Sequence, residues 1–387
     1  MVTTLLERLI TLLVVVGCFG VLILVHEFGH FLVARWSGVR VLRFSIGFGP
    51  RVFGWRWRGT EYWVSWVPLG GYVKMAGEDA VGQTAKPDEY AGQSVGARAR
   101  IILAGPLVNY LVAVVAMWAV FTIGYPELLP IIGKVQAEMP AAAAGFSVGD
   151  RVVAIGGERI GTWDELTAAI RRSAGEPLSV AVEREGQTIE LRVTPRSDQI
   201  TDLLGDARRV GLIGVTPSGA LRLSPAGPLA AAGLSVRKTA EWTLLTLRGL
   251  GSLVSRKIPM RESVTGPIGI GSMIWEAVHD LVERVLKEGL AGLPSEAMRT
   301  DWVHLLMLLA LISLSLSIFN VFPIPILDGG HLFFLLIEKL RGAPLSRIIQ
   351  ERATQVSFVV LMTFVVVVCA NDLERFGLLQ KLLDLLK

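Results

Sequence analysis

Four long apolar stretches run along the chain, separated by segments in which polar residues recur at short intervals. The stretches cover residues 9–25, 101–123, 302–322 and 356–370. The first continues beyond a short polar interruption to Arg35, and the fourth is short unless flanking residues extend it. Apolar runs of about this length are typical of helices that cross a bilayer. The pattern therefore predicts a polytopic α-helical membrane protein with about four spans.

A different pattern lies between the second and third stretches. Residues 152–155, 178–182 and 189–193 are short strand candidates, and turn signals stand at 156–157 and 185–186. Residues 162–173 have the spacing of an amphipathic helix, with Thr162 as its expected N-cap. We expect an inserted α+β domain here. The sequences of residues 140–146 and 149–152 and the turn at 155–157 make it similar to a PDZ domain of the bacterial type.

These patterns divide the chain into seven segments. We expect a first span (1–36), a cytoplasmic loop (37–97), a second span (98–124), a PDZ-like domain (130–196), a helical connector (197–300), a third span with a broken helix (301–340), and a fourth span with a C-terminal tail (350–387).

Composition supports the membrane prediction. Of the 387 residues, 52% are hydrophobic and 19% charged, which is too apolar for an ordinary soluble enzyme. The net charge is +4, but the chain has no run of Lys and Arg interleaved with aromatics, so we expect no nucleic-acid partner. Only Cys18 and Cys369 are present, without metal-binding spacing, and they predict no disulfide framework.

The positive charges predict an orientation. Nine Lys or Arg residues occupy positions 36–100, and four more lie between the third and fourth stretches. Such loops face the cytoplasm by the positive-inside rule. The termini and residues 125–300 are then expected on the extracytoplasmic side of the membrane.

The polar interruption in the first stretch has the pattern His26-Glu27-Phe28-Gly29-His30. Residues four apart share one face of a helix, so both imidazoles can bind one zinc ion while Glu27 acts as general base. Ionisable side chains inside a span are costly unless they are paired or line a cavity, which favours a functional site. His30 would lie about 7 Å from the level of Arg35, near the cytoplasmic face.

A catalytic zinc site needs a third protein ligand. Asp328 is a candidate because Pro323 and Pro325 break the third span just before it, and such a break is tolerated where it lines a cavity. His331 is a rival ligand on chemical grounds. His279 and His304 are far from both motifs in sequence, and we expect them at surfaces or interfaces.

The motif at 26–30, the sequence Asn320-Val321-Phe322-Pro323-Ile324-Pro325-Ile326-Leu327-Asp328-Gly329-Gly330 and the intervening PDZ-like domain together resemble the site-2 protease family of intramembrane zinc metalloproteases. The similarity is greatest to the bacterial regulator of sigma-E protease group. Supporting matches lie at residues 105–109 and 266–270. The resemblance implies His26, His30 and Asp328 as zinc ligands and Glu27 as base, and it implies a membrane-reentrant β-hairpin at residues 44–75.

The hairpin suggests how a substrate is held. A spanning helix must be unwound before cleavage, and a strand edge beside the metal could pair with its freed backbone. We expect Tyr62, Val64 and Trp66 to form this edge. Asn320 is expected to hydrogen-bond the substrate backbone, and Gly105 and Asn109 are further substrate-binding candidates.

The sequence thus predicts a zinc endopeptidase that cuts single-span membrane proteins, such as anti-sigma factors or remnant signal peptides. The PDZ-like domain would exclude untrimmed substrates or bind a peptide. One alternative is a membrane PDZ scaffold with a non-catalytic metal, although a structural zinc normally has four protein ligands. Another is a transporter, which would need paired broken helices in both halves of the chain.

Overall fold

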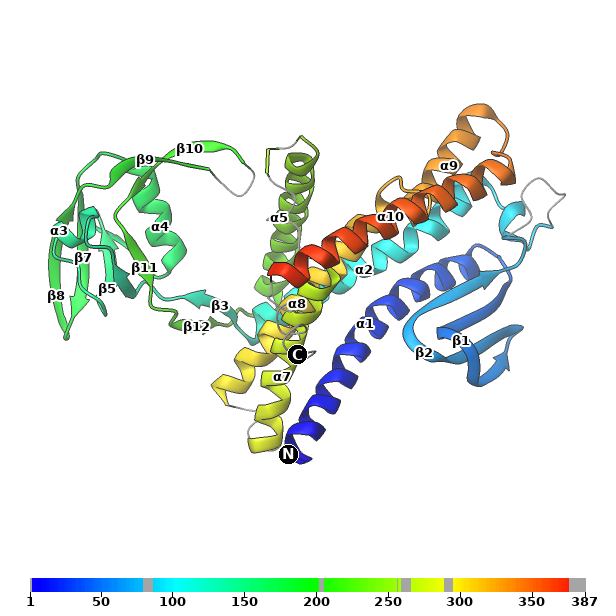
Figure 1. The fold of residues 1–387 in the computed structure, drawn as a ribbon, viewed down its shortest axis with the longest axis horizontal. Helices are drawn as coiled ribbons and strands as arrows, with labels where there is room; N and C mark the ends of the chain where they lie inside the picture. Colours follow the sequence, from blue (N-terminus) through cyan, green and yellow to red (C-terminus); the bar gives the residue numbers. More distant parts are fainter. Residues whose placement is uncertain are drawn as a thin grey trace, which may run out of the picture. The chain divides into compact units, whose positions relative to one another are not determined.

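The structure is a computed structural model that describes residues 2–78, 86–201, 205–255, 257–258, 266–288 and 295–375. The predicted tail from residue 376 onward lies outside them. The chain forms two compact units, each shown in Figure 1. Unit 1 comprises Met1–Ala119, Gly233–Thr243 and Arg261–Lys387, and unit 2 comprises Val120–Ala232 and Leu244–Met260.

Within the described residues, four helices are long and apolar enough to cross a membrane, as the hydrophobic pattern predicts. They are α1 (Val2–Trp36), α2 (Val95–Ile123), α8 (Glu296–Val321) and α10 (Arg347–Arg375). On α10 most apolar side chains are exposed, Val359 and Val366 among them. Such a face is stable in lipid, where a hydrocarbon solvent replaces a protein core.

The third span is broken where the two prolines predict it. Helix α8 ends at Val321, and α9 (Asp328–Arg341) begins after a six-residue bend. A side chain at Gly329 would place its Cβ 2.2 Å from the carbonyl oxygen of Val321. Glycine therefore lets the bend pack against the first turn of α9, and this sets the position of Asp328.

Strands β1 (Val41–Trp57) and β2 (Thr60–Met75) form an antiparallel hairpin in unit 1. Both strands fold back on themselves. Residues 41–46 pair with 61–64 on one side and with 71–75 on the other, while 51–57 pair with 60–65. Phe44 packs with Phe31 and Ala34 of α1 in one buried cluster. Within the described residues, 71–75 form an outer edge of this sheet.

Unit 1 also contains a further long helix and a short one. Helix α7 (Pro267–Glu288) shares a buried cluster with α1 and α8. The buried carboxylate of Asp372 on α10 accepts hydrogen bonds from the amides of Gly266 and Gly269 at the start of α7. A short 3-10 helix, η1 (Tyr90–Gly92), precedes α2.

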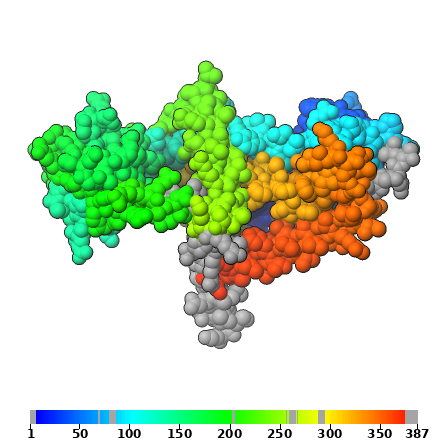
Figure 2. Space-filling model, turned by 90° about the horizontal axis from the view of Figure 1, so that it is seen from above, coloured from blue at the N-terminus to red at the C-terminus, as the bar shows by residue number. Residues whose placement is uncertain are grey.

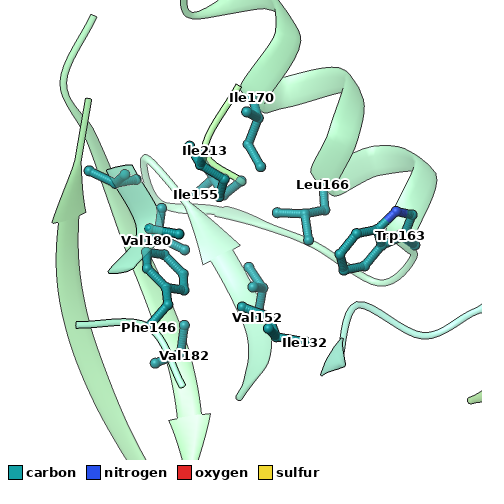
Figure 3. Close-up of a cluster of buried hydrophobic side chains, with 12 residues drawn as sticks. Ile132, Phe146, Val152, Ile155, Trp163, Leu166, Ile170, Val180, Val182 and Ile213 are labelled. Atoms are coloured by element: carbon teal, nitrogen blue, oxygen red, sulfur yellow. The ribbon is translucent and has the colours of Figure 1, made fainter. Parts of the chain in front are cut away.

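Unit 2 contains the predicted α+β domain. Its four-stranded sheet has the order β6-β5-β7-β8 and is covered by α4 (Trp163–Arg172). Thr162 accepts from the amide of Glu165 in a capping box, as its N-cap position predicts. Figure 3 shows Leu166 and Ile170 of α4 pointing toward Val180 and Val152 of the sheet. The strands are β5 (Arg151–Ile155), β6 (Glu158–Arg159), β7 (Leu178–Arg184) and β8 (Gln187–Val193).

The remaining elements of unit 2 correct one prediction. The segment from residue 197 was expected to be a helical connector, but its first part consists of β9 (Arg196–Thr201), β10 (Ala207–Leu212), β11 (Val215–Pro217) and β12 (Leu221–Ser224). β11 and β12 pair with β4 (Ile132–Val135) and β3 (Tyr125–Leu128), which lie far away in the sequence. These pairings are not visible in a local pattern. A four-residue helix, α3 (Pro140–Ala143), packs beside them.

The expected helices follow after residue 227. Helix α5 (Pro228–Val254) contributes its residues 233–243 to unit 1. There Trp242 packs against Ala113 and Leu314 of the spanning helices. Residues 256, 259–265 and 289–294 of the predicted connector lie outside the described part of the chain.

Candidate active site

The two histidines of the HExxH motif lie one helical turn apart on α1. Both are buried at 8% exposure, and their Nε2 atoms are 3.2 Å apart. Two imidazole nitrogens this close, in an otherwise apolar stretch of α1, form two corners of a potential metal site.

Asp328 at the start of α9 supplies a third corner. Its Oδ2 lies 3.1 Å from Nε2 of His26 and 3.5 Å from Nε2 of His30. Tetrahedral zinc with bonds of 2.0–2.1 Å would separate its ligand atoms by about 3.3 Å. The three side chains therefore fit zinc in type and in spacing.

His331, the rival third ligand, occupies a different place. It lies one turn into α9, and its ring packs edge-on against Phe334. Among the described residues, the potential metal-binding cluster contains His26, His30 and Asp328 but not His331. His279 stacks on Trp275 of α7 and His304 is exposed on α8, both outside the cluster.

Helix α2 closes the far side of the cluster. A Cβ atom at Gly105 would lie 2.4 Å from Nε2 of His30 and 2.8 Å from Cε1 of His26. Because glycine has no side chain, the space beside Nε2 of His30, which a bound ion would need, stays open. Gly105 therefore lies against the two histidines of the candidate metal site. Asn109 is also buried, at 1% exposure, beside His26.

A cavity of about 580 Å³ opens beside the cluster. Glu27, His30 and Asp328 line its inner part, so the predicted base and two predicted ligands face the same space. The cavity is large enough for a short extended peptide segment together with the attacking water. Its other lining residues include Val73, Met75, Glu78, Tyr90, Arg98, Ile101, His331, Phe334 and Glu338.

The sequence did not single out three polar residues of this cavity. Arg98 and Glu338 form a paired, two-bond contact between α2 and α9, with one N···O distance of 3.1 Å. Burial raises the pKa of Tyr90, so its side chain is a neutral hydroxyl at neutral pH. In the sequence, Arg98 was considered only as one of the positive charges of residues 36–100. Glu338 interrupts an apolar helix, and this feature could have indicated a functional or paired carboxylate.

Asn320 lies elsewhere. It lines an apolar groove of about 920 Å³ between α8 and α10, together with Phe319, Leu327 and Val356. Figure 2 shows α8 in yellow-orange lying beside α10 in orange to red. One of the residues that line the groove, Leu327, directly precedes the candidate ligand Asp328 in the sequence.

The structure corrects the predicted strand edge. Tyr62 pairs with Phe44 on one side and Trp55 on the other, and Val64 pairs with Ile46 and Phe53, so neither has a free edge. Trp66 is 71% exposed, and none of these three predicted residues lines the cavity.

Residues 71–75 are the edge that reaches the cavity. Val73 and Met75 line it, and a Cβ at Gly71 would lie 3.5 Å from Cγ of Glu27. The edge beside the site was therefore predicted in the wrong part of β2. Because the strand folds back, residues 60–65 lie inside the sheet and residues 71–75 form its outer edge.

Comparison with known proteins supports a peptidase. A family model described as peptidase family M50 matches residues 14–364. A Rhizobium meliloti protein whose name includes the words zinc metalloprotease is 34% identical over 370 residues, covering 91% of this chain and 93% of the relative. The Regulator of sigma E protease of Salmonella typhi is 31% identical, covering 92% of this chain and 96% of the relative.

The alignment with the Salmonella protein is longer than this chain. It extends over 459 positions, whereas this chain has 387 residues. The Salmonella protein therefore contains residues that have no counterpart here.

Proposed function

The chain belongs to peptidase family M50, and on that premise we propose that it is a zinc endopeptidase that cleaves the transmembrane segments of single-span membrane proteins in regulated proteolysis. The single observation that carries this proposal is the cluster of His26, His30 and Asp328, with ligand atoms 3.1–3.5 Å apart. Family membership favours the peptidase over the alternative of a membrane scaffold.

The roles of the residues follow from their positions. His26, His30 and Asp328 would hold zinc, which when bound supplies Lewis acidity to the scissile carbonyl and acidity to the attacking water. Glu27 takes a proton from that water and returns it to the leaving amine. Its place in the cavity wall, next to two of the ligands, is suited to both transfers.

The substrate backbone has a place to bind. An unwound substrate segment can add as a strand to the edge at residues 71–75, because backbone hydrogen bonds recognise any sequence and pockets beside them select side chains. The side chains of Val73 and Met75 give this part of the cavity an apolar wall. Tyr90 provides a neutral hydroxyl there.

A substrate helix needs a path through the lipid. We place it in the groove between α8 and α10, where Asn320 is one of few polar groups among apolar side chains. A polar side chain in such a groove can bond a backbone that has left its helix. The anti-sigma factor and remnant signal peptide classes share the required feature, a single apolar span.

Replacement of Glu27 with Gln tests the proposal. In proteoliposomes with a fluorescent single-span substrate, Glu27→Gln should lower the cleavage rate at least about 100-fold, the usual contribution of general acid–base catalysis. Zinc content, measured by mass spectrometry, should stay at the wild-type level because the three ligands remain.

Glu158→Gln in unit 2 is the matched control, since that carboxylate is exposed and far from α1 in the sequence. Normal cleavage by Glu27→Gln would refute the assigned base. A purified wild-type protein that neither contains nor binds zinc would refute the metal site itself.

A further inference from the structure

Three groups on one face of α2 surround the two histidines. They belong to Ile101, Gly105 and Asn109, spaced four residues apart, so they form a single stripe along the helix. The carbonyl oxygen of Ile101 lies 2.8 Å from Nδ1 of His30. Gly105 leaves space beside Nε2 of His30 and Cε1 of His26, and the side-chain amide of Asn109 lies 3.3 Å from Nδ1 of His26.

The chemistry of a histidine ligand defines what these groups must do. An imidazole that binds a metal through Nε2 carries its proton on Nδ1, and that N–H needs an acceptor. For His30, the Ile101 carbonyl is this acceptor. His26 needs an equivalent partner on its own Nδ1 side.

Asn109 can supply it. Its Oδ1 is buried and has no hydrogen-bond partner within the described part of the chain. Its Nδ2 is the atom placed against Nδ1 of His26, which would put two donors face to face in the metal-binding tautomer. A half-turn of the amide exchanges the two atoms, after which Oδ1 accepts from the Nδ1–H of His26. One rotation thus satisfies both groups.

We propose that Asn109 is a positioning residue that holds His26 in its zinc-binding tautomer by accepting a hydrogen bond from Nδ1–H. This inference rests on the proposed zinc function. It replaces the earlier expectation that Asn109 contacts substrate, because a side chain at 1% exposure has no surface for one. The role is indirect, since Asn109 acts through His26.

The backbone of Asn109 is itself held in place. Its carbonyl oxygen accepts a hydrogen bond of 2.8 Å from Oγ of Ser313, a fully buried side chain on α8. Because α8 leads into the bend before Asp328, the same pair of helices positions the outer partner of His26 and the third ligand. The side chain of Asn109 therefore contacts His26 on α1, while its backbone is bonded to α8, the helix that leads to the bend before Asp328.

Three variants separate an acceptor from a packing residue. Asn109→Leu retains most of the volume and removes the acceptor, and Asn109→Ala removes both. Asn109→Asp keeps an acceptor and can form the carboxylate–histidine–zinc arrangement found in many metal sites. Asn320→Leu is the matched control, because it makes the same replacement outside the metal cluster.

The experiment measures zinc affinity on the full-length protein in detergent. Each apo protein is titrated with Zn²⁺ in competition with a chromophoric chelator, and its thermal unfolding is followed with and without zinc. Asn109→Leu and Asn109→Ala should bind zinc about 10–100-fold more weakly, as expected when an outer partner is lost. Asn109→Asp should bind within about tenfold of wild type, and Asn320→Leu should match wild type.

Each outcome is decisive. Wild-type affinity in Asn109→Leu, or in Asn109→Ala if the leucine variant does not fold, overturns the role of Asn109 and leaves the protease proposal intact. Equal loss of affinity in Asn109→Asp overturns it too, since an acceptor would then be insufficient. Absence of zinc binding by the wild type overturns the metal proposal, and this inference with it.

Discussion

At the residue scale, the space around the metal cluster depends on a missing side chain as much as on the ligands. Gly105 faces Nε2 of His30 and Cε1 of His26, and a Cβ atom there would lie 2.4 Å from the first and 2.8 Å from the second. Real Cβ atoms do not approach other atoms so closely, so either α2 or the imidazoles would have to move.

We therefore predict that Gly105→Ala lowers zinc affinity at least tenfold. The physical reason is that the added methyl group would lie 2.4 Å from Nε2 of His30, where it would displace the imidazole or crowd a bound ion. Gly96→Ala is the control, because a Cβ at Gly96, in the same helix, meets no atom within 4 Å. Zinc stoichiometry after purification measures the effect. Equal stoichiometry in the two variants would mean that the ion lies elsewhere.

A second residue-scale feature stabilises unit 2. Asp150, which is fully buried, accepts from the amide of Ser147 and from Nε and Nη2 of Arg184 at 2.7–2.8 Å. Burial alone would raise the pKa of Asp150, but its hydrogen bonds to Arg184 and Ser147 hold that pKa below its ordinary value. Asp150, which belongs to the Gly149-Asp150 motif of the sequence, thus fixes the position of Arg184 on β7.

This shift has a definite sign. A carboxyl with a lowered pKa in the folded state stabilises the fold above its unfolded pKa of about 3.9, and that stabilisation is lost as pH falls through the folded value. We predict that unit 2 loses stability in acid below about pH 4. Hydrogen exchange of the β7 amides in the intact protein, measured from pH 6 to pH 3, checks this.

The variant for this test is Asp150→Asn. It should lower stability by about 2 kcal/mol at neutral pH, because hydrogen bonds to a charged group are lost, and it should flatten the acid dependence. Asp198→Asn, which removes a surface ion pair with Arg196, should have little effect. An unchanged acid profile in Asp150→Asn would assign the pH dependence to other groups.

At the element scale, the proposed mechanism requires the sheet edge at residues 71–75 to bind the backbone of a substrate. Successive residues of a strand direct their N–H groups to opposite sides. Of Val73 and Lys74, which pair with Phe44 and Arg43, one therefore donates inward to the ladder and the other faces the open edge.

Proline scanning can distinguish the two. Of Val73→Pro and Lys74→Pro, we expect one to break the ladder and lower the unfolding temperature, and the other to keep stability but reduce cleavage by about tenfold or more. Val73→Ala and Lys74→Ala are the controls for the lost side chains. A stable proline variant that cleaves like its alanine control would argue against strand addition.

The hairpin also shows where prediction from sequence reaches its limit. The capping box at Thr162 and the helical spacing of His26 and His30 involve residues close in sequence, so they could be predicted. The foldback of β1 and β2 depends on glycines such as Gly47, which has a φ of 86° and no room for a side chain beside Val67. No alternation pattern shows which half of β2 becomes the edge.

At the scale of the whole molecule, the unpredicted features are those that join distant parts of the chain. Asp328 and His26 are neighbours across about 300 residues, and a break in an apolar helix only suggested this contact. For the Arg98–Glu338 pair, 240 residues apart, the sequence offered only the charge of Glu338 at the end of an apolar run and nothing that pointed to Arg98 as its partner. Local pattern determines the elements, whereas side-chain packing in three dimensions determines which polar groups share the cavity.

The orientation in the membrane is the last property that the charge pattern predicts. Positive charges concentrate in residues 36–100 and in the link around residues 339–352, while the α+β domain lies between the second and third spans. Four spans that each cross the membrane once would put both basic segments on one side and the domain on the other. The positive-inside rule assigns the basic side to the cytoplasm.

Cysteine labelling tests this arrangement. In a Cys18→Ser/Cys369→Ser background, Thr188→Cys in the exposed face of β8 should react with a membrane-impermeant maleimide added to intact spheroplasts. Lys86→Cys and Ala343→Cys should react only in inside-out vesicles. Because α1, α2, α8 and α10 alternate in direction, a reversed result at Thr188 alone would require an odd number of additional crossings. Reversal at all three sites would invert the molecule and place the zinc cavity on the extracytoplasmic side.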